Sequence, residues 1–150
     1  MNSMSNTHSA LAAQLDFFDN QHPPKSDFMH DVLTGFALPI KSVPPKYFYD
    51  QAGSALFDQI TEVPEYYVTR TELALLDRIA PLLAQRAGPG AVVVEPGSGS
   101  SLKIRKLLDA LHDPAGYVGL DISENHLIAA CADLADDYPD LNIGAICADF

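Results

Sequence analysis

The side chains best suited to bind a ligand follow the stretch VVVEPGSGSS, residues 92–101. Three valines lead into Glu95, and Gly97 and Gly99 follow with G-x-G spacing. Glycine has no Cβ, so a turn of this kind lets a ligand approach the backbone closely. Such turns hold a nucleoside triphosphate, a dinucleotide or another nucleoside ligand, and the neighbouring residues must distinguish these classes.

The spacing argues against the two phosphate-containing ligands. A P-loop requires G-x-x-x-x-G-K-[ST], whereas Gly97 and Gly99 have another spacing and Lys103 is followed by isoleucine. A dinucleotide turn prefers G-x-G-x-x-G, and Leu102 stands at its third glycine position, which weakens an NAD site without excluding it. S-adenosylmethionine (SAM) fits better, because it carries no phosphate and needs no helix N-terminus to bind an anion.

Three predicted strands each end in an acidic residue at the same edge of the sheet. Asp121 ends the second strand, at the separation expected for a carboxylate that accepts hydrogen bonds from ribose hydroxyls. Asp149 ends the third, where it can accept from an adenine amino group while Phe150 packs on the ring. Glu95 ends the first and is expected to hold the turn or a ligand ammonium. An NAD site shares Asp121 but does not require Asp149, so these residues favour SAM over the NAD cofactor of an oxidoreductase.

The alternation of elements around these residues predicts an α/β fold. Apolar runs at 91–95, 117–121 and 141–150 are typical of buried strands, and residues 101–111 and 123–138 have helical periodicity. Strand–helix–strand–helix–strand is the first half of a doubly wound, Rossmann-like sheet. Three parallel strands leave a face and an edge of the sheet uncovered, so we expect the chain to be the front part of a longer protein.

The chain divides into three predicted segments. Residues 1–25 are polar and are expected to form a flexible tail. Residues 26–88 are predicted to form a helical N-terminal segment that contributes to a substrate site. Residues 89–150 are predicted to form the nucleoside-binding, Rossmann-like half of a domain.

Local signals place the helices of the N-terminal segment. Ser26 and Ser54 are expected to cap the first two helices. Thr69 and Glu72 have the spacing of a capping box at the start of the third and longest helix. Pro81 lies inside this third helix and is expected to kink or split it.

Composition excludes several functions. Among its 150 residues the chain has 9 basic and 20 acidic ones, and the net charge of −11 repels nucleic-acid backbones and anionic membranes. Two cysteines do not make a secreted disulfide framework, and the N-terminus lacks the basic region of a signal peptide, so we expect a cytoplasmic protein. No apolar run approaches the about 20 residues that span a membrane. The five histidines lack metal-ligand spacing and are assigned to the surface or the core, and GSGSS is not the G-x-S-x-G elbow of a hydrolase.

From about residue 26 to residue 150 the chain resembles the histidine Nα-methyltransferases of ergothioneine biosynthesis, a family of class I SAM-dependent methyltransferases. The resemblance rests on the distinctive stretch PPKYFYDQAGSALFDQITEVPEYYVTRTE (44–72), on EPGSGSSLKIRKLLDAL (95–111), and on YVGLDIS and YPDLNIGAICADF further along. It implies a SAM-dependent N-methyltransferase that acts on the α-amino group of L-histidine and gives trimethylhistidine (hercynine).

The resemblance also implies roles for individual residues. Those that contact the SAM cofactor are Gly97, Lys103, Asp121, Asp149 and Phe150. Tyr66, the first tyrosine of PEYY, touches the histidine substrate, and Tyr49, in FYD, is the catalytic tyrosine close to the substrate amine. Without the resemblance, core packing with a satisfied hydroxyl is the simpler role for these tyrosines. Tyr47 and Tyr67 keep that structural role.

The chain departs from the family pattern in two residues and in length. Pro96 stands where the family usually has leucine, and Val68 where it usually has proline. Family members are much longer, and their additional part completes the sheet and supplies most of the histidine-binding residues. We therefore expect this chain alone to be inactive on histidine. The amine substrate is open to other amino acids, and the alternatives are an NAD-dependent oxidoreductase half or a non-catalytic SAM-binding remnant.

Overall fold

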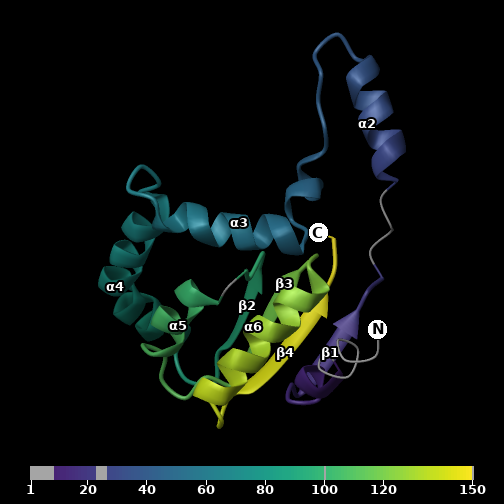
Figure 1. Ribbon diagram of the computed structural model, residues 1–150. Coiled ribbons are helices and arrows are strands. Elements are labelled where there is room, and N and C mark those ends of the chain that lie inside the picture. The colour runs from purple at the N-terminus through teal and green to yellow at the C-terminus, as the bar shows by residue number, and fades with distance from the viewer. Residues whose placement is uncertain (1–8, 23–26, 100, 150) are drawn as a thin grey trace.

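The computed structural model describes residues 9–22, 27–99 and 101–149, and within these ranges four parallel strands form one sheet (Figure 1). The order across the sheet is β1–β4–β3–β2. The strands are β1 (Phe17–Asn20), β2 (Val92–Pro96), β3 (Gly116–Asp121) and β4 (Asn142–Cys147). Strands β2, β3 and β4, with the helices between them, confirm the predicted first half of a doubly wound, Rossmann-like sheet.

Most of the labelled helices lie on one face or at one end of this sheet, and one projects away from it (Figure 1). The helices are α2 (Phe28–Ala37), the 3₁₀ helix η1 (Pro45–Phe48), α3 (Gln51–Glu62), α4 (Val68–Ala87), α5 (Leu102–Leu108) and α6 (Glu124–Asp137). Helix α6 packs along β3 and β4, α4 packs against α5, and α3 lies across the C-terminal ends of the strands (Figure 1). Helix α2 projects away from this body (Figure 1). No helix of the described residues is long and apolar enough to cross a membrane.

The core lies on the face of the sheet that α6 covers. Tyr117 of β3, Ile143 of β4 and Leu127 of α6 are almost wholly buried there. Side chains alternate between the two faces of a strand, so Val92 and Val94 of β2 project from the opposite face. They are 59% and 56% exposed. Helices α5 and α6 therefore pack on one face of the sheet, and the other face of β2 is open.

Strand β1 lies within the segment that the sequence predicted to be a flexible tail. It pairs in parallel with β4, and the Asp16 carboxylate accepts a hydrogen bond from the Ile143 backbone N–H at 2.6 Å. The ring of Phe17 lies over Gly144, where an added Cβ would fall 2.0 Å from a ring atom. The prediction of a tail is therefore wrong over residues 17–20. The polarity of the tail suggested disorder, but the unpaired backbone groups along β4 offer this segment a partner.

Helices α2 and α3 begin at aspartates. The Asp27 carboxylate accepts a hydrogen bond from the backbone N–H three residues later at 2.9 Å, and that of Asp50 does the same at 2.7 Å. A carboxylate satisfies a free helix N–H as a serine does, and its charge is favourable at the positive end of the helix dipole. Ser54 is therefore an interior residue of α3, and the prediction that it caps this helix is wrong. Ser26 lies outside the described residues.

The predicted capping box of α4 does not form. The helix begins at Val68, one residue before Thr69, and the N-cap residue Tyr67 makes no side-chain capping hydrogen bond. The Glu72 carboxylate instead pairs with the ammonium of Lys103 on α5. A contact between two helices therefore replaces the local hydrogen bond that the spacing suggested.

Pro81 does not split α4, which continues as one helix to Ala87. Proline lacks the N–H that would donate to the preceding turn, so the helix loses one backbone hydrogen bond there. Ala80 and Ala84 on either side are buried, with exposed fractions of 3% and 1%. Tertiary packing thus holds the helix together across the proline.

Candidate functional site

The turn between β2 and α5 is pinned to the neighbouring strand. The backbone N–H groups of Gly97 and Ser98 both donate to the Leu120 carbonyl of β3, at 2.8 and 3.1 Å. Gly97 and Gly99 have φ angles of +69° and +52°, in the left-handed region that glycine adopts without strain. An added Cβ at Gly99 would meet only the Gly97 carbonyl oxygen, at 3.9 Å, so the space above the turn is open.

A cleft of about 510 Å³ is lined by this turn, by the C-terminal ends of β2 and β3, and by the helix α3. From the side of the sheet and α5 it is lined by residues that include Glu95, Gly97, Gly99, Lys103 and Asp121. From the side of η1 and α3 it is lined by residues that include Phe48, Tyr49, Leu56, Phe57 and Ile60. The cleft therefore has one polar wall and one largely apolar wall, as a site for an organic ligand requires.

Glu95 is a partly buried carboxylate of the polar wall. It accepts a hydrogen bond from the Tyr117 hydroxyl at 2.8 Å. Burial raises the pKa of the Glu95 carboxyl, and the Tyr117 hydrogen bond and the charge of Lys103 act in the opposite direction. Burial and the neighbouring Glu95 raise the pKa of Tyr117 well above its usual range, so Tyr117 remains a neutral donor. Tyr117 thus orients Glu95 toward the cleft.

Asp121 connects the turn to the start of α6. One carboxylate oxygen accepts from the Ser123 backbone N–H at 2.9 Å, and the other accepts from the Gly99 N–H at 3.4 Å. Each carboxylate oxygen has two acceptor positions, so Asp121 keeps capacity for donors of a ligand. Ser123 is the N-cap residue of α6, but its side chain makes no capping hydrogen bond.

The tyrosines predicted to bind substrate lie on the α3 side. Tyr49 follows η1, lines the cleft and is 59% exposed. Its position depends on the close approach of η1 to α3 at Gly53, where an added Cβ would fall 1.9 Å from the Phe48 carbonyl oxygen. Tyr66 does not belong to the lining, but its ring packs edge-on against Phe57, which does, with the ring centroids 5.9 Å apart.

The two tyrosines assigned a structural role differ from each other. The hydroxyl of Tyr47 donates to Asp31 of α2 at 2.6 Å, and its ring packs edge-on against Phe28. Tyr67 is 67% exposed at the start of α4. Tyr47 therefore ties α2 to η1, whereas Tyr67 is a surface residue.

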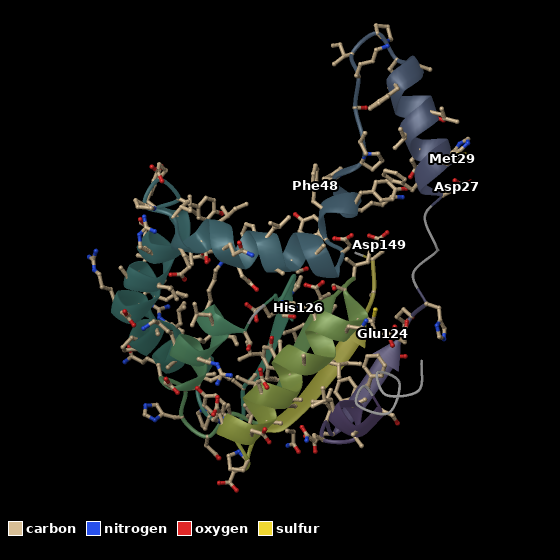
Figure 2. The ribbon with its side chains drawn as sticks, in the orientation of Figure 1. Asp27, Met29, Phe48, Glu124, His126 and Asp149 are labelled. Atoms are coloured by element: carbon tan, nitrogen blue, oxygen red, sulfur yellow. The ribbon has the colours of Figure 1, made fainter. Side chains whose placement is uncertain are left out.

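The remaining predicted cofactor residues follow β4. Strand β4 ends at Cys147, so Asp149 lies two residues beyond it, exposed and outside the cleft lining. Figure 2 places Asp149 at the same end of the sheet as Phe48, and it interacts electrostatically with Lys46 of η1. Phe150 lies outside the described residues. The structure therefore brings Gly97, Lys103 and Asp121 together with Tyr49, and leaves Asp149 at the edge of this group.

Sequence reasoning missed two parts of the lining. His126, which was assigned to the surface or the core, lines the cleft from the first turn of α6, beneath α3 (Figure 2). Leu56, Phe57 and Ile60 form the apolar wall. The spacing of these three residues on one face of a helix was visible in the sequence, but it equally fits a core-facing helix. His126 lies five residues after Asp121, and that position alone carried no signal.

The described residues fit a nucleoside cofactor and show no metal centre. They contain no group of three or more His, Cys, Asp or Glu side chains that could hold a metal ion. The open space at Gly99 admits a ligand to the backbone, and Asp121 at the end of β3 suits a ribose diol. Glu95 and Lys103 offer one anion and one cation, which matches the ammonium and carboxylate of an amino-acid group.

A parallel half-sheet with a glycine turn and carboxylates at its C-terminal edge is the cofactor-binding part of a Rossmann-like methyltransferase fold. The chain belongs to the family of histidine-specific, SAM-dependent methyltransferases, whose family model matches residues 28–150. The match begins at α2 and includes every residue of the cleft.

Curated relatives carry names of the same kind. A histidine N-alpha-methyltransferase of Mycolicibacterium smegmatis is 45% identical over 124 residues, and one of Mycobacterium tuberculosis is 42% identical over 123 residues. Each match covers 80% of this chain and 38% of the relative. An ergothioneine biosynthesis protein 1 of Neurospora crassa is 37% identical over 91 residues, which cover 58% of this chain and 10% of the relative. The chain thus spans less than half the length of the relatives it matches.

Proposed function

We propose that this chain is the N-terminal, cofactor-binding part of an enzyme that uses SAM to methylate the α-amino group of L-histidine, with trimethylhistidine as the product. The observation that carries the proposal is the single cleft that contains Gly97, Lys103, Asp121 and Tyr49. The family to which the chain belongs and the printed names of its relatives support the choice of histidine. The two buried, free cysteines support a reducing, cytoplasmic setting.

The polar wall would hold the ribose and the amino-acid end of the cofactor. When bound, SAM supplies a methyl group activated by a sulfonium. Asp121 would accept hydrogen bonds from the ribose hydroxyls, and Lys103 and Glu95 would bind the carboxylate and ammonium of the amino-acid end. Asp149 would accept a hydrogen bond from the adenine amino group, and Phe150 would pack on the adenine ring.

The α3 side would place the substrate amine. The hydroxyl of Tyr49 can accept a hydrogen bond from the amine and orient its lone pair toward the methyl group. The amine must be neutral to attack, and catalysis then depends mainly on holding its nitrogen in line with the bond that breaks. Phe48 and Phe57 would exclude water and tolerate the cationic product at their ring faces. Tyr66 would reach the substrate from behind Phe57.

The test uses the complete protein that carries this chain. It is incubated with SAM and L-histidine, and the products are followed by mass spectrometry as additions of one, two and three methyl groups. Sequential methylation of histidine supports the proposal. Methylation of another amino acid in preference to histidine would change the substrate, and binding of NADH without binding of SAM would replace the proposal with an oxidoreductase.

A further inference from the structure

Glu72 forms an ion pair that its sequence motif did not predict. Its carboxylate lies 2.7 Å from the Lys103 ammonium, and the two side chains are 44% and 43% exposed. Glu72 is the fifth residue of α4, at the start of its second turn, and Lys103 is the second residue of α5. The N-cap residue of α4 makes no side-chain capping hydrogen bond, and the carboxylate of Glu72 contacts the neighbouring helix α5 instead.

Lys103 is the one lysine or arginine among the described residues that line the cleft. The two cations that follow it on α5 have other partners: Arg105 pairs with Asp137 of α6, and Lys106 pairs with Asp77 of α4 at 2.6 Å. Recognition of an anionic group in the cleft therefore depends on Lys103.

A lysine binds an anionic group better when a neighbouring side chain restricts its ammonium to one position. Its four-carbon side chain is flexible and strongly hydrated, so an unpaired ammonium at a half-exposed position samples many rotamers. One hydrogen bond to Glu72 occupies one of three N–H donors and leaves two for a ligand. Glu72, the anchor, lies at the rim of the cleft, where solvent weakens its repulsion of a second carboxylate.

We propose that Glu72 is a positioning residue, which holds the Lys103 ammonium in place for the carboxylate of the SAM amino-acid end. The inference rests on the proposed function and adds to it a residue outside the cleft lining. It also connects α4, which begins directly after the PEYY motif of the substrate side, to the cofactor turn. Cofactor binding and the placement of the substrate segment would then share one contact.

The experiment is a double-mutant cycle in the complete protein, with the dissociation constant of SAM measured by isothermal titration calorimetry. The variants are Glu72→Gln, Lys103→Met and the double variant. Glu72→Gln should weaken SAM binding about three- to fivefold, the upper range for an exposed ion pair. Lys103→Met should weaken it about tenfold, and adding Glu72→Gln to Lys103→Met should change nothing further, because the anchor has lost the group it holds.

Two controls separate positioning from general stability. Asp77→Asn breaks the other ion pair between α4 and α5, whose members lie outside the cleft lining, and should leave SAM binding unchanged. The second control is 5′-methylthioadenosine, which has the nucleoside but no amino-acid carboxylate. All variants should bind this probe as the unmodified protein does.

Three results would overturn the inference while SAM still binds the unmodified protein. They are unchanged or tighter SAM binding by Glu72→Gln, equal weakening by Asp77→Asn, and a Glu72→Gln effect that persists in the Lys103→Met background. A complete failure of the unmodified protein to bind SAM would overturn the proposed function itself, and this inference with it.

Discussion

At the scale of single residues, Glu95 combines burial with a place in the cleft. Its carboxylate is held by the neutral Tyr117 hydroxyl, and Lys103 is near enough to lower its pKa in part. Burial nevertheless raises this pKa above the value of 4.5 that the unfolded chain would show. Such a group costs folding stability when it is ionised, and a bound ligand ammonium would offset that cost.

Glu95→Gln should therefore stabilise the protein at neutral pH while weakening SAM binding. Between pH 4.5 and the raised pKa the folded state binds more protons than the unfolded state, so stability falls as the pH rises through this window. The melting temperature of the variant should exceed that of the unmodified protein above the window, and the difference should vanish below pH 4.5. Glu65→Gln, at an exposed glutamate, is the matched control for the substitution itself. A constant difference at all pH values would contradict this account.

Tyr66 provides a second test at this scale. Tyr66→Ala should weaken histidine binding about two- to tenfold, the effect of one lost hydrogen bond, and leave SAM binding nearly unchanged. Titration calorimetry with each ligand measures both. Tyr66→Phe keeps the ring contact with Phe57, so it measures how much the hydroxyl alone contributes to histidine binding. Tyr67→Ala, which removes an exposed ring, is the control. Equal losses for the two ligands would indicate a folding defect instead of a substrate contact.

At the scale of elements, strand β1 can pair with β4 because Gly144 of β4 leaves room for the ring of Phe17. Phe17 occupies the space that a side chain at position 144 would take, and Asp16 anchors the strand to the backbone of β4. The ring is 44% exposed, so it can swing outward if that space is filled. The pairing of β1 is therefore specific but weakly buried.

Gly144→Ala should displace Phe17 and loosen β1 while the rest of the sheet remains. Filling a packed space lowers the free energy of unfolding by about 1–3 kcal/mol. Because the Phe17 ring is partly exposed and can move outward, we expect a loss at the lower end of that range. Hydrogen–deuterium exchange should become faster at the backbone amides of residues 16–21 and stay slow in β3. The double variant Phe17→Ala, Gly144→Ala removes the clash and should regain protection. If protection is unchanged in the single variant, the ring does not hold this strand.

At the scale of the whole molecule, the described residues leave apolar surface uncovered. The open face of β2 and the exposed apolar residues of α2 lack a covering element among the described residues. Leu33 and Phe36 of α2 are 66% and 54% exposed. The relatives that the chain matches are more than twice as long.

The 150-residue chain alone should therefore not methylate histidine, whereas the complete protein should. Mass spectrometry of matched reactions compares the two, and circular dichroism reports whether the isolated chain is folded. Trimethylhistidine from a folded isolated chain would show that the described cleft suffices. SAM binding without turnover would identify the chain as the cofactor half.

The sequence alone established the strand–helix alternation, the glycine turn and the acids at or near the ends of the strands, because these features depend on local periodicity and on neighbouring residues. The motif from 44 to 72 established the family resemblance, which the family model over residues 28–150 confirms. Local patterns carry this information since each element is formed mainly by its own residues.

Tertiary packing decided which of these residues meet. The partner of Glu72, the pairing of β1 with β4 and the place of His126 in the cleft depend on residues 20 to more than 100 positions away. A local pattern cannot distinguish a glutamate that caps its own helix from one that contacts another helix, because a backbone N–H and a lysine ammonium can each pair with the same carboxylate. The free energy that selects between them comes from the packing of α4 on α5 and of β1 on β4, which exists only when the chain is folded.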